Sequence, residues 1–273
     1  YFYLKKDPDT LITNSLLFHK LGTSSKSDVL IYKEYDKEYN LSFFKSRTKK
    51  YLFLNVAKTE SNKFRILDLE AENFDLQCFN KRSKKHLYYI DDTPEEFYVL
   101  SNRKNQENFA LYRTDKKNTL EKNWKIFIRH NKKELIENFI CFQDYIILET
   151  RKNGLPFLTQ VNKDTKNKLI IKFDDPAYSV ELVNNSDYKT KNFTFAYSSL
   201  RTPTAIFSQN LYSQKRKKVW QQNILHHKES NYETKRLFLK VRDGKKVPVS
   251  LIYKKGINLE KAPLLQYGYG SYG

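Results

Sequence analysis

The stretch Tyr51-Leu-Phe-Leu-Asn-Val56 is the first of four aromatic and β-branched segments that recur along the chain at an almost constant interval. The other three are Phe97-Tyr-Val-Leu100, Tyr145-Ile-Ile-Leu148 and Phe193-Thr-Phe-Ala-Tyr197. The four begin at residues 51, 97, 145 and 193, so their starts are 46, 48 and 48 residues apart. Residues of these types favour β-strands. A strand that returns at a fixed interval predicts an internal structural repeat.

Three further series of strand-like segments keep step with the first. The second series lags the first by 13, 12, 12 and 12 residues and consists of residues 64–69, 109–112, 157–161 and 205–207. A third and less regular series follows at residues 77–79, 124–127, 169–171 and 217–220. A fourth precedes each unit, at residues 39–43, 87–90, 139–142 and 178–182. Each repeat therefore contains four strand-like segments.

One incomplete unit stands ahead of these, with strand-like segments at residues 2–4, 16–18 and 29–32. Four short strands in a unit of roughly 40–50 residues are typical of a β-propeller blade. We considered a β-sandwich, but a repeat of constant length favours the propeller, and the strand-like periodicity within each unit excludes a helical solenoid. The sequence therefore predicts an all-β fold in which residues 1–225 form about five blades, the first of them without its first strand.

The repeat stops after about residue 225, and residues 226–273 follow a different pattern. Residues 235–242 and 247–253 read as two strands, and Asp243-Gly244 between them suits the turn of a β-hairpin. The apolar run at residues 262–266 suits a buried strand, and the glycine-rich Tyr267-Gly-Tyr-Gly-Ser-Tyr-Gly273 follows it. We expect residues 226–273 to be an inter-domain segment and the first strands of a truncated α/β domain.

The composition narrows the class of protein. An aromatic share of 15% argues against disorder, and no apolar stretch approaches the roughly 18 residues of a membrane-spanning helix. The formal charge of +19 has two interpretations, which are binding to nucleic acid or an acidic membrane, and a general drift of composition toward Lys, Asn, Ile, Tyr and Phe. Because the lysines are spread along the whole chain, we favour drift. We expect a cytoplasmic protein that binds neither nucleic acid nor membrane.

Cysteine and histidine usage gives no sign of a metal or another cofactor. Cys78 and Cys141 are far apart, and we expect two reduced core thiols rather than a disulfide. The five histidines, at positions 19, 86, 130, 226 and 227, lack metal-ligand spacing, so surface or packing roles are expected. Gly268, Gly270 and Gly273 satisfy G-x-G-x-x-G literally, but a dinucleotide site also needs a following helix and a distal acidic residue.

The closing segment Ala262-Pro-Leu-Leu-Gln-Tyr-Gly-Tyr-Gly-Ser-Tyr-Gly273 resembles the first catalytic-domain strand and loop of the oligopeptidase B group in the prolyl oligopeptidase family. The resemblance covers essentially the whole chain and extends through residues 7–11, 173–178, 197–203 and 241–253. It implies a seven-bladed propeller that caps an α/β-hydrolase domain, in a cytosolic serine peptidase that cleaves short peptides after Lys or Arg. It also implies that the Tyr269 hydroxyl stabilises the oxyanion of the tetrahedral intermediate.

This chain departs from the family pattern in what it lacks. No two of its seven glycines are four residues apart, so the G-x-S-x-G turn that carries the serine of α/β-hydrolases does not occur in these residues. In the family the catalytic Ser, Asp and His lie beyond this segment, and so do the acidic residues that recognise a basic side chain. The resemblance implies that the chain alone is inactive, and that its partners are the catalytic domain and short basic peptides.

Two questions stay open at this point. A positively charged chain attracts basic peptides poorly, so a local acidic lining would have to compensate, with Asp91, Asp92, Glu95 and Glu96 as candidates. The chain could instead be a stand-alone binding propeller or the product of a decayed peptidase gene. A dedicated binding module would have no reason to keep the hydrolase-like start at residues 232–273.

Overall fold

The structure is a computed structural model and describes residues 1–81, 83–183 and 185–269. Within these ranges the strands form six antiparallel sheets, and the helical backbone consists of three short 3₁₀ turns, η1 (Ser25–Ser27), η2 (Glu121–Asn123) and η3 (Glu229–Asn231). No helix among the described residues is long and apolar enough to cross a membrane. Four of the sheets have four strands each, and we name them blades A to D in chain order.

Each blade is a meander of four consecutive strands. Blade A consists of β4 (Asn40–Lys45), β5 (Tyr51–Lys58), β6 (Ser61–Asp68) and β7 (Leu76–Cys78). Blade B consists of β8 (Tyr88–Asp92), β9 (Glu96–Ser101), β10 (Ala110–Asp115) and β11 (Lys125–Ile128). Blade C consists of β12 (Leu135–Cys141), β13 (Tyr145–Lys152), β14 (Leu155–Asn162) and β15 (Lys168–Ile170). Blade D consists of β16 (Tyr178–Leu182), β17 (Asn192–Ser199), β18 (Ala205–Asn210) and β19 (Arg216–Gln221). The predicted repeat is confirmed, and the stretches quoted first are the second strands of the blades.

The sheet that precedes blade A is a partial blade of three strands, β1 (Phe2–Lys6), β2 (Thr13–Phe18) and β3 (Val29–Lys33). β2 packs against β4 as β14 packs against β16, and β14 is the third strand of its blade. β2 therefore holds a third-strand position and β1 a second-strand position. The sheet thus has the three strands that a blade without its first strand would have.

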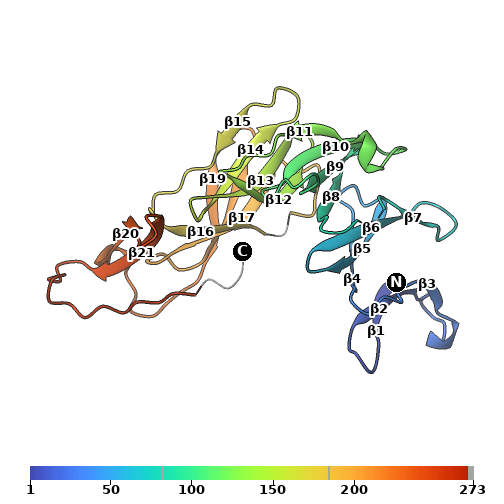
Figure 1. Cartoon of the computed structure of the whole chain (residues 1–273), viewed down its shortest axis with the longest axis horizontal. Helices are drawn as coiled ribbons and strands as arrows, with labels where there is room; N and C mark the ends of the chain where they lie inside the picture. The colour runs from blue at the N-terminus through green and yellow to red at the C-terminus, as the bar shows by residue number, and fades with distance from the viewer. Residues whose placement is uncertain (82, 184, 270–273) are drawn as a thin grey trace.

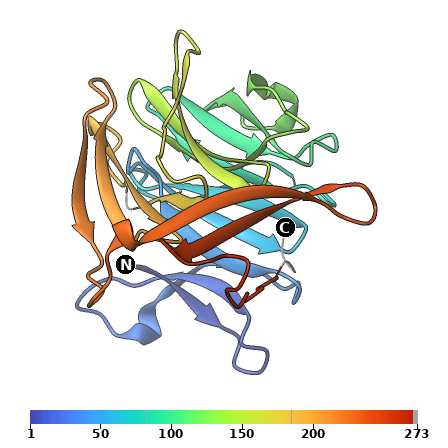
Figure 2. The same ribbon diagram turned by 90° about the vertical axis from the view of Figure 1, so that its left-hand side faces the viewer.

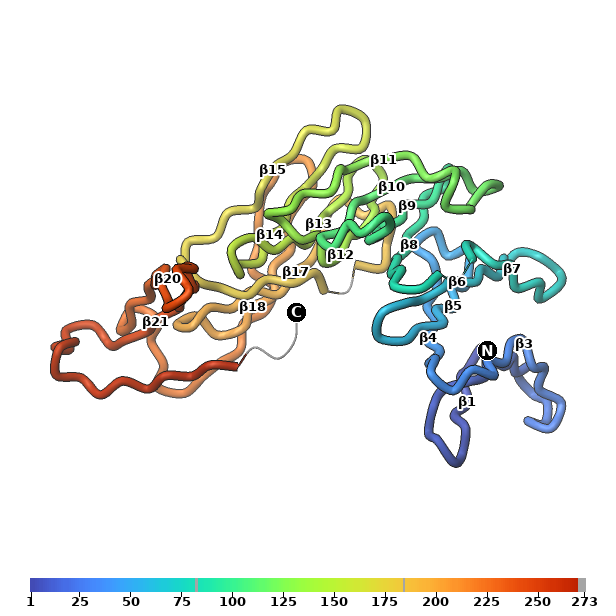
Figure 3. The backbone as a smooth tube through the Cα atoms, viewed as in Figure 1, coloured from blue at the N-terminus to red at the C-terminus, as the bar shows by residue number. Residues whose placement is uncertain are grey.

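The blades follow one another around an axis in chain order. In Figure 2 they pass from the partial blade in blue, through blades A to C, to blade D in orange, with the red hairpin in front. Figure 1 places the partial blade and the hairpin at opposite ends of the molecule. The tube in Figure 3 shows that the chain enters each blade only after it has completed the previous one.

The second strands of blades A and B supply cores on both faces of their blades, because successive side chains point to opposite sides of a sheet. In β5, Leu54 packs in the cluster shared with the partial blade, and its neighbour Phe53 packs in the cluster shared with blade B. In β9, Val99 faces blade A and Leu100 faces blade C. All four residues are at most 1% exposed. Since burying such a side chain stabilises the fold by about 1.5–3 kcal/mol, one strand stabilises two interfaces.

The predicted hairpin is present, but the strand predicted after it is not. β20 (Tyr232–Lys240) pairs along its length with β21 (Lys246–Lys254), and Gly244 in the turn has a φ of +80°. Residues 262–266 form no strand, and Leu264 and Leu265 are 77% and 92% exposed. A buried strand needs a neighbour for its backbone groups, and none of the described strands pairs with this segment. Gly270 and Gly273 of the glycine-rich motif lie outside the described residues.

Asn62 of β6 connects blade A to blade B through the backbone of Tyr88 in β8. Its side-chain nitrogen donates to the Tyr88 carbonyl at 2.7 Å, and its side-chain oxygen accepts from the Tyr88 N–H at 2.9 Å. The Tyr88 hydroxyl in turn accepts a hydrogen bond from the Phe64 N–H at 2.8 Å. Asn62 is 1% exposed, and Tyr88 is fully buried. These contacts form a two-way polar link between neighbouring blades.

Replacing Asn62 by alanine should leave the Tyr88 N–H and carbonyl without partners in a buried place. An unsatisfied buried polar group costs about 1–3 kcal/mol, so we expect Asn62→Ala to lower the free energy of unfolding by about 2–5 kcal/mol in urea denaturation. Asn73→Ala, at an exposed loop position, is the control and should change it by less than about 0.5 kcal/mol. A loss as small as that of the control would show that Asn62 does not hold the two blades together.

Candidate functional site

The first strands of blades A, B and C line a hollow of about 680 Å³ along the axis. Its wall includes Phe44 of β4, Tyr89 of β8, and Asn138 and Ile140 of β12. Phe44 is 43% exposed and Tyr89 is 42% exposed, so both rings present surface rather than being sealed in a core. Burial raises the pKa of the Tyr89 hydroxyl. The wall thus combines aromatic surface with a carboxamide.

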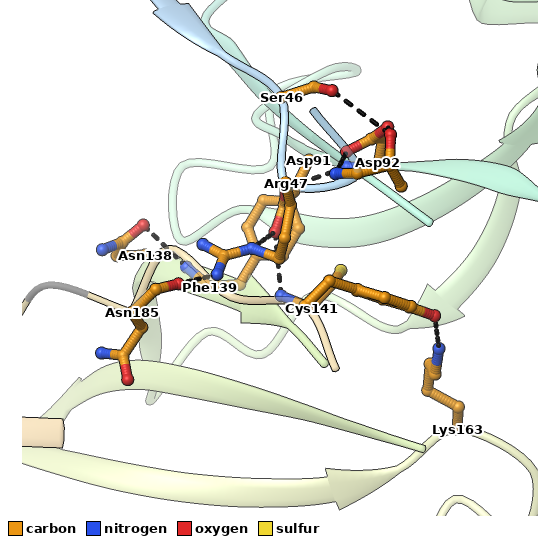
Figure 4. A network of polar contacts seen from close by, with 11 residues as sticks. Ser46, Arg47, Asp91, Asp92, Asn138, Phe139, Cys141, Lys163 and Asn185 are labelled. Atoms are coloured by element: carbon orange, nitrogen blue, oxygen red, sulfur yellow. Dashed lines mark hydrogen bonds and ion pairs between the residues drawn. The ribbon is translucent and has the colours of Figure 1, made fainter. Parts of the chain in front are cut away.

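At one end of this hollow a set of buried polar groups joins all four complete blades (Figure 4). We call Arg47, Asp91, Asp92 and Asn185, with the backbone of Cys141, the axial cluster. Arg47 Nε donates to Asp91 Oδ2 at 3.1 Å, and Arg47 Nη1 donates to the backbone carbonyl of Asn185. The N–H of Cys141 donates to the same Asp91 oxygen at 2.9 Å. The cluster therefore takes two side chains from blade B and one group from each of blades A, C and D.

The two aspartates of the cluster are buried and already have partners. Asp92 accepts hydrogen bonds from the Thr48 N–H at 3.0 Å and from the Thr48 hydroxyl, and the Lys116 ammonium lies 3.7 Å from Asp92 Oδ2. Burial raises the pKa of Asp91, while the charge of Arg47 opposes that rise. Burial lowers the pKa of Lys116 against the opposing charge of Asp92. Asp91 and Asp92 therefore connect blades, and Asp91 also borders the hollow. Their suggested role as an acidic lining for substrate stays a prediction.

The other two candidates for that lining lie nearer the surface. Glu95 is exposed in the turn between β8 and β9. Glu96 Oε1 accepts a hydrogen bond from Arg113 Nη1 at 3.5 Å. These carboxylates do not converge with Asp91 and Asp92 on one wall of the hollow.

Asn185 reaches the cluster because the connection from β16 to β17 is long. It runs over residues 183–191, whereas the matching connections in blades A, B and C run over residues 46–50, 93–95 and 142–144. The Gln143 N–H of blade C donates to the Tyr188 carbonyl at 3.2 Å, and Lys163 Nζ donates to the Tyr188 hydroxyl at 3.1 Å. Asn185 Nδ2 donates to the Thr194 carbonyl at 2.8 Å. The connection is thus held against blade C, with the Asn185 carbonyl facing Arg47.

A second polar network lies at the other end of blade D and joins two of the segments that carry the family resemblance. Asp175, from residues 173–178, accepts hydrogen bonds from the Tyr197 hydroxyl at 2.7 Å and from Arg201 Nε at 2.6 Å, both from residues 197–203. Burial by itself raises the pKa of Asp175, but the hydrogen bonds from Tyr197 and Arg201 outweigh it and hold the pKa below its usual value.

The same loop anchors the segment that leads to the hairpin. The Thr202 hydroxyl donates to Glu229 Oε2 of η3 at 3.1 Å, and His227 Nε2 donates to the Arg201 carbonyl at 2.7 Å. Gln221 at the end of β19 donates to Glu229 Oε1 at 2.9 Å. The chain therefore leaves blade D in a fixed direction.

The hairpin makes a further contact with blade C. Arg236 Nη2 donates to the carbonyl of Asn153 at 2.7 Å, in the turn from β13 to β14. Gly154, next in that turn, has a φ of +70°, and a Cβ atom there would lie 3.2 Å from Arg236 Nη2 and 3.5 Å from Pro248 Cγ. A side chain at position 154 would therefore be strained and would crowd the hairpin.

Tyr269, the predicted oxyanion donor, lies in irregular chain beyond the hairpin and is 66% exposed. The axial cluster and the network around Asp175 do not include it. Its role in catalysis stays a prediction.

Histidine and cysteine positions support no metal centre. Within the described residues no three His, Cys, Asp or Glu side chains are placed to hold a metal ion. His86 is 5% exposed and its Nε2 lies 2.8 Å from the Ser101 hydroxyl, which confirms a packing role. Both cysteines are free thiols. Cys141 is buried as predicted, but Cys78 is exposed at the end of β7, the outermost strand of its blade, so its predicted core position is wrong.

Comparison with protein families provides the deciding observation. The family model described as "Prolyl oligopeptidase, N-terminal beta-propeller domain" matches residues 1–222. The chain belongs to the prolyl oligopeptidase family. The matched range contains the partial blade and all of blades A to D, and it ends one residue after β19.

Individual family members agree with this assignment. Dipeptidyl aminopeptidase BI from Pseudoxanthomonas mexicana is 30% identical over 274 residues, which cover 100% of this chain and 38% of the relative. Protease 2 from Moraxella lacunata is 27% identical and covers 93% of this chain and 36% of the relative. The structure of oligopeptidase B from Trypanosoma brucei, in a closed form with covalently bound antipain, matches with a TM-score of 0.87 at 25% identity. That match covers 95% of this chain and 38% of the other chain.

This family member therefore spans little more than a third of the length of the relatives it matches. It contains the propeller part of a prolyl oligopeptidase family peptidase, and the predicted family and propeller fold are confirmed. Sequence reasoning missed the axial cluster. The adjacent Asp91 and Asp92 at the end of a predicted strand were a signal of buried polar contacts, but nothing in the spacing identified Arg47 as the partner.

The lowered pKa of Asp175 predicts an acid-dependent loss of stability. A carboxyl group whose pKa is lowered in the folded state stabilises the fold above its ordinary pKa of about 3.9. That contribution disappears as the pH falls through the lower folded-state value. We expect Asp175→Asn to be less stable than the parent at pH 7, and the difference to shrink below about pH 4 in urea unfolding. Asp174→Asn, at the exposed neighbouring position, should follow the parent; a difference for Asp175→Asn that does not change with pH would contradict the assignment.

Proposed function

We propose that this chain is the substrate-gating part of a serine peptidase that cleaves short peptides after Lys or Arg in the cytoplasm. The observation that carries the proposal is the family match over residues 1–222, followed by a hairpin that lies beyond the last blade. Residues 226–273 are then the inter-domain segment and the first strands of the catalytic domain. The relatives named as peptidases support the reaction class.

The propeller contributes selection by size. Its blades are joined by buried apolar clusters, so the wall of the axial hollow is built from packed sheets rather than from a loop or a hinged lid. A short flexible peptide can enter a confined space beside a catalytic centre, while a folded protein cannot. The aromatic rings of Phe44 and Tyr89 and the carboxamide of Asn138 supply apolar and hydrogen-bonding surface inside that space.

Tyr269 contributes to catalysis as a donor to the developing oxyanion. A phenol hydroxyl is a suitable donor because it carries no charge of its own and is bound to a rigid ring. A donor placed where negative charge develops is worth about 3–4 kcal/mol of barrier. Tyr269 is 66% exposed in this chain, and in the proposal the catalytic centre is assembled around it.

In this proposal, specificity for basic residues comes from the catalytic domain rather than from the propeller. The chain carries a formal charge of +19, and Asp91 and Asp92 are occupied by Arg47, Thr48 and the Cys141 N–H. The carboxylates that would recognise Lys or Arg therefore belong to the catalytic domain. The name of the Pseudoxanthomonas relative describes removal of dipeptides, which makes an exopeptidase the alternative within the same reaction class.

The first measurement is the intact mass of the native gene product together with its activity on short Lys- and Arg-containing peptides. We expect a mass well above the 32.7 kDa of this chain and hydrolysis on the carboxyl side of the basic residue. A mass near 32.7 kDa without hydrolysis would overturn the proposal in favour of a binding propeller or a decayed gene. Release of amino-terminal dipeptides would replace the endopeptidase with the exopeptidase.

In that native protein, Tyr269→Phe removes a single hydroxyl. We expect kcat to fall by about 10²–10³-fold with little change in KM, because the lost hydrogen bond forms mainly in the transition state. Tyr267→Phe, two residues away in the same segment, is the control and should leave kcat within a factor of about two. An unchanged kcat for Tyr269→Phe would exclude the oxyanion role.

A further inference from the structure

We propose that Arg47 closes the end of the axial hollow that lies away from the hairpin, and thereby determines the side from which peptides reach the interior. This inference deepens the proposed function and rests on it for its link to substrate, whereas the closure itself is a property of the propeller. It follows from the direction of the strands, from the contacts of one guanidinium, and from the residues that bound the hollow.

The axial cluster and the hairpin lie at opposite ends of the blades. β13 begins at Tyr145, directly after the Cys141 end of β12 that belongs to the cluster, and it ends at Lys152, next to the Asn153 carbonyl that accepts from the hairpin. A strand of eight residues at about 3.3 Å per residue is roughly 26 Å long. The cluster and the hairpin are therefore separated by the full length of a strand.

Arg47 joins blade A to blades B, C and D with one side chain. Its guanidinium donates to Asp91 of blade B and to the Asn185 carbonyl of blade D, and it lies 5.8 Å from the centre of the Phe142 ring of blade C. Blades A and D are three positions apart in the arc. A contact between them crosses the axis instead of following one blade boundary.

The cluster also bounds the hollow. Arg47, Asp91 and Ser186 line it together with Phe44, Tyr89 and Asn138 of the first strands. The connection over residues 183–191 supplies both Ser186 and Asn185, and Tyr188 fixes that connection to blade C. A peptide that approached from this end would have to displace Arg47 from Asp91 and from Asn185.

An arginine suits this position better than a lysine. The planar guanidinium offers several N–H donors in a fixed geometry, and here two of them serve partners on different blades. The side chain of Arg47 is 13% exposed and that of Asp91 is 11% exposed. Removing the charge would leave Asp91 buried with backbone N–H groups as its remaining donors, and such an uncompensated charge is strongly destabilising.

The Arg47→Lys variant tests the closure of the hollow without abolishing folding. A lysine keeps a positive charge beside Asp91, but a single ammonium on a flexible stem does not reproduce the two-directional fork. We expect the Lys variant to fold while the Asn185 connection comes away from blade A. Arg113→Lys is the control, since Arg113 forms an ion pair with Glu96 within blade B at 3.5 Å and touches no other blade through that pair.

The closure is tested first without reference to activity. Spin labels at Lys45→Cys and Lys189→Cys, both exposed positions on the two joined blades, are introduced in a Cys78→Ser background, while the buried Cys141 is left in place. Double electron–electron resonance should give one narrow distribution of distances between the two labels in the parent and in Arg113→Lys. Arg47→Lys should give a longer and broader distribution. The same narrow distance in all three proteins would overturn the proposal that Arg47 closes the hollow.

The consequence for substrate is tested in the native gene product with peptides of increasing length. We expect Arg47→Lys to raise the ratio of kcat/KM for a 30-residue peptide to that for a 5-residue peptide about tenfold, with kcat for the short peptide unchanged. An unchanged ratio despite an altered label distance would overturn the link to substrate entry. If the parent hydrolyses no peptide, the proposed function fails, and the label distances alone decide whether Arg47 closes the propeller.

Discussion

Every blade of this chain carries apolar side chains on both faces of its sheet, and a single blade has nothing against which to bury them. The alternation of Phe53 and Leu54 in β5, and of Val99 and Leu100 in β9, assigns consecutive residues to different inter-blade cores. The smallest unit that buries these faces is therefore a pair of adjacent blades, and blades A, B and C each belong to two such pairs. The arrangement around an axis, the axial hollow and the placement of the hairpin all depend on this requirement.

The chain's many cations and aromatic rings meet in the structure. Arg216 lies 5.0 Å from the centre of the Phe173 ring and 5.3 Å from that of Phe195, and burial lowers its pKa. Lys116 lies 4.9 Å from the centre of the Tyr51 ring and 5.2 Å from that of Phe97. The face of an aromatic ring attracts a cation and tolerates its alkyl stem. Some of the many Lys, Arg, Tyr and Phe side chains thus pack against one another within the blades. This agrees with the view that the net charge does not indicate a nucleic-acid partner.

Periodicity predicted the propeller because each strand of the repeat is recognisable from its own local sequence. The starts at residues 51, 97, 145 and 193 needed no knowledge of distant contacts, and the hairpin was visible through its Asp243-Gly244 turn. The axial cluster could not be found in this way, because Arg47 and Asn185 are 138 residues apart and meet through a side chain and a carbonyl. The strand predicted at residues 262–266 failed for a related reason. Its apolar pattern is compatible with a strand, but pairing depends on neighbours that the local sequence does not describe.

No strand in the described chain pairs with a strand of another blade, since each sheet is complete within its own run of sequence. The hydrogen-bond ladders therefore stop at every blade boundary, and the boundaries are held by side-chain packing with isolated links such as Asn62 to Tyr88. Packed faces can slide or part without breaking a ladder, whereas a shared strand would have to be pulled out bond by bond. Each blade is therefore stiffer than the boundary that joins it to the next blade. Slow internal motion of this protein should thus be concentrated between blades, and whole blades should be the units that evolution can add, delete or replace.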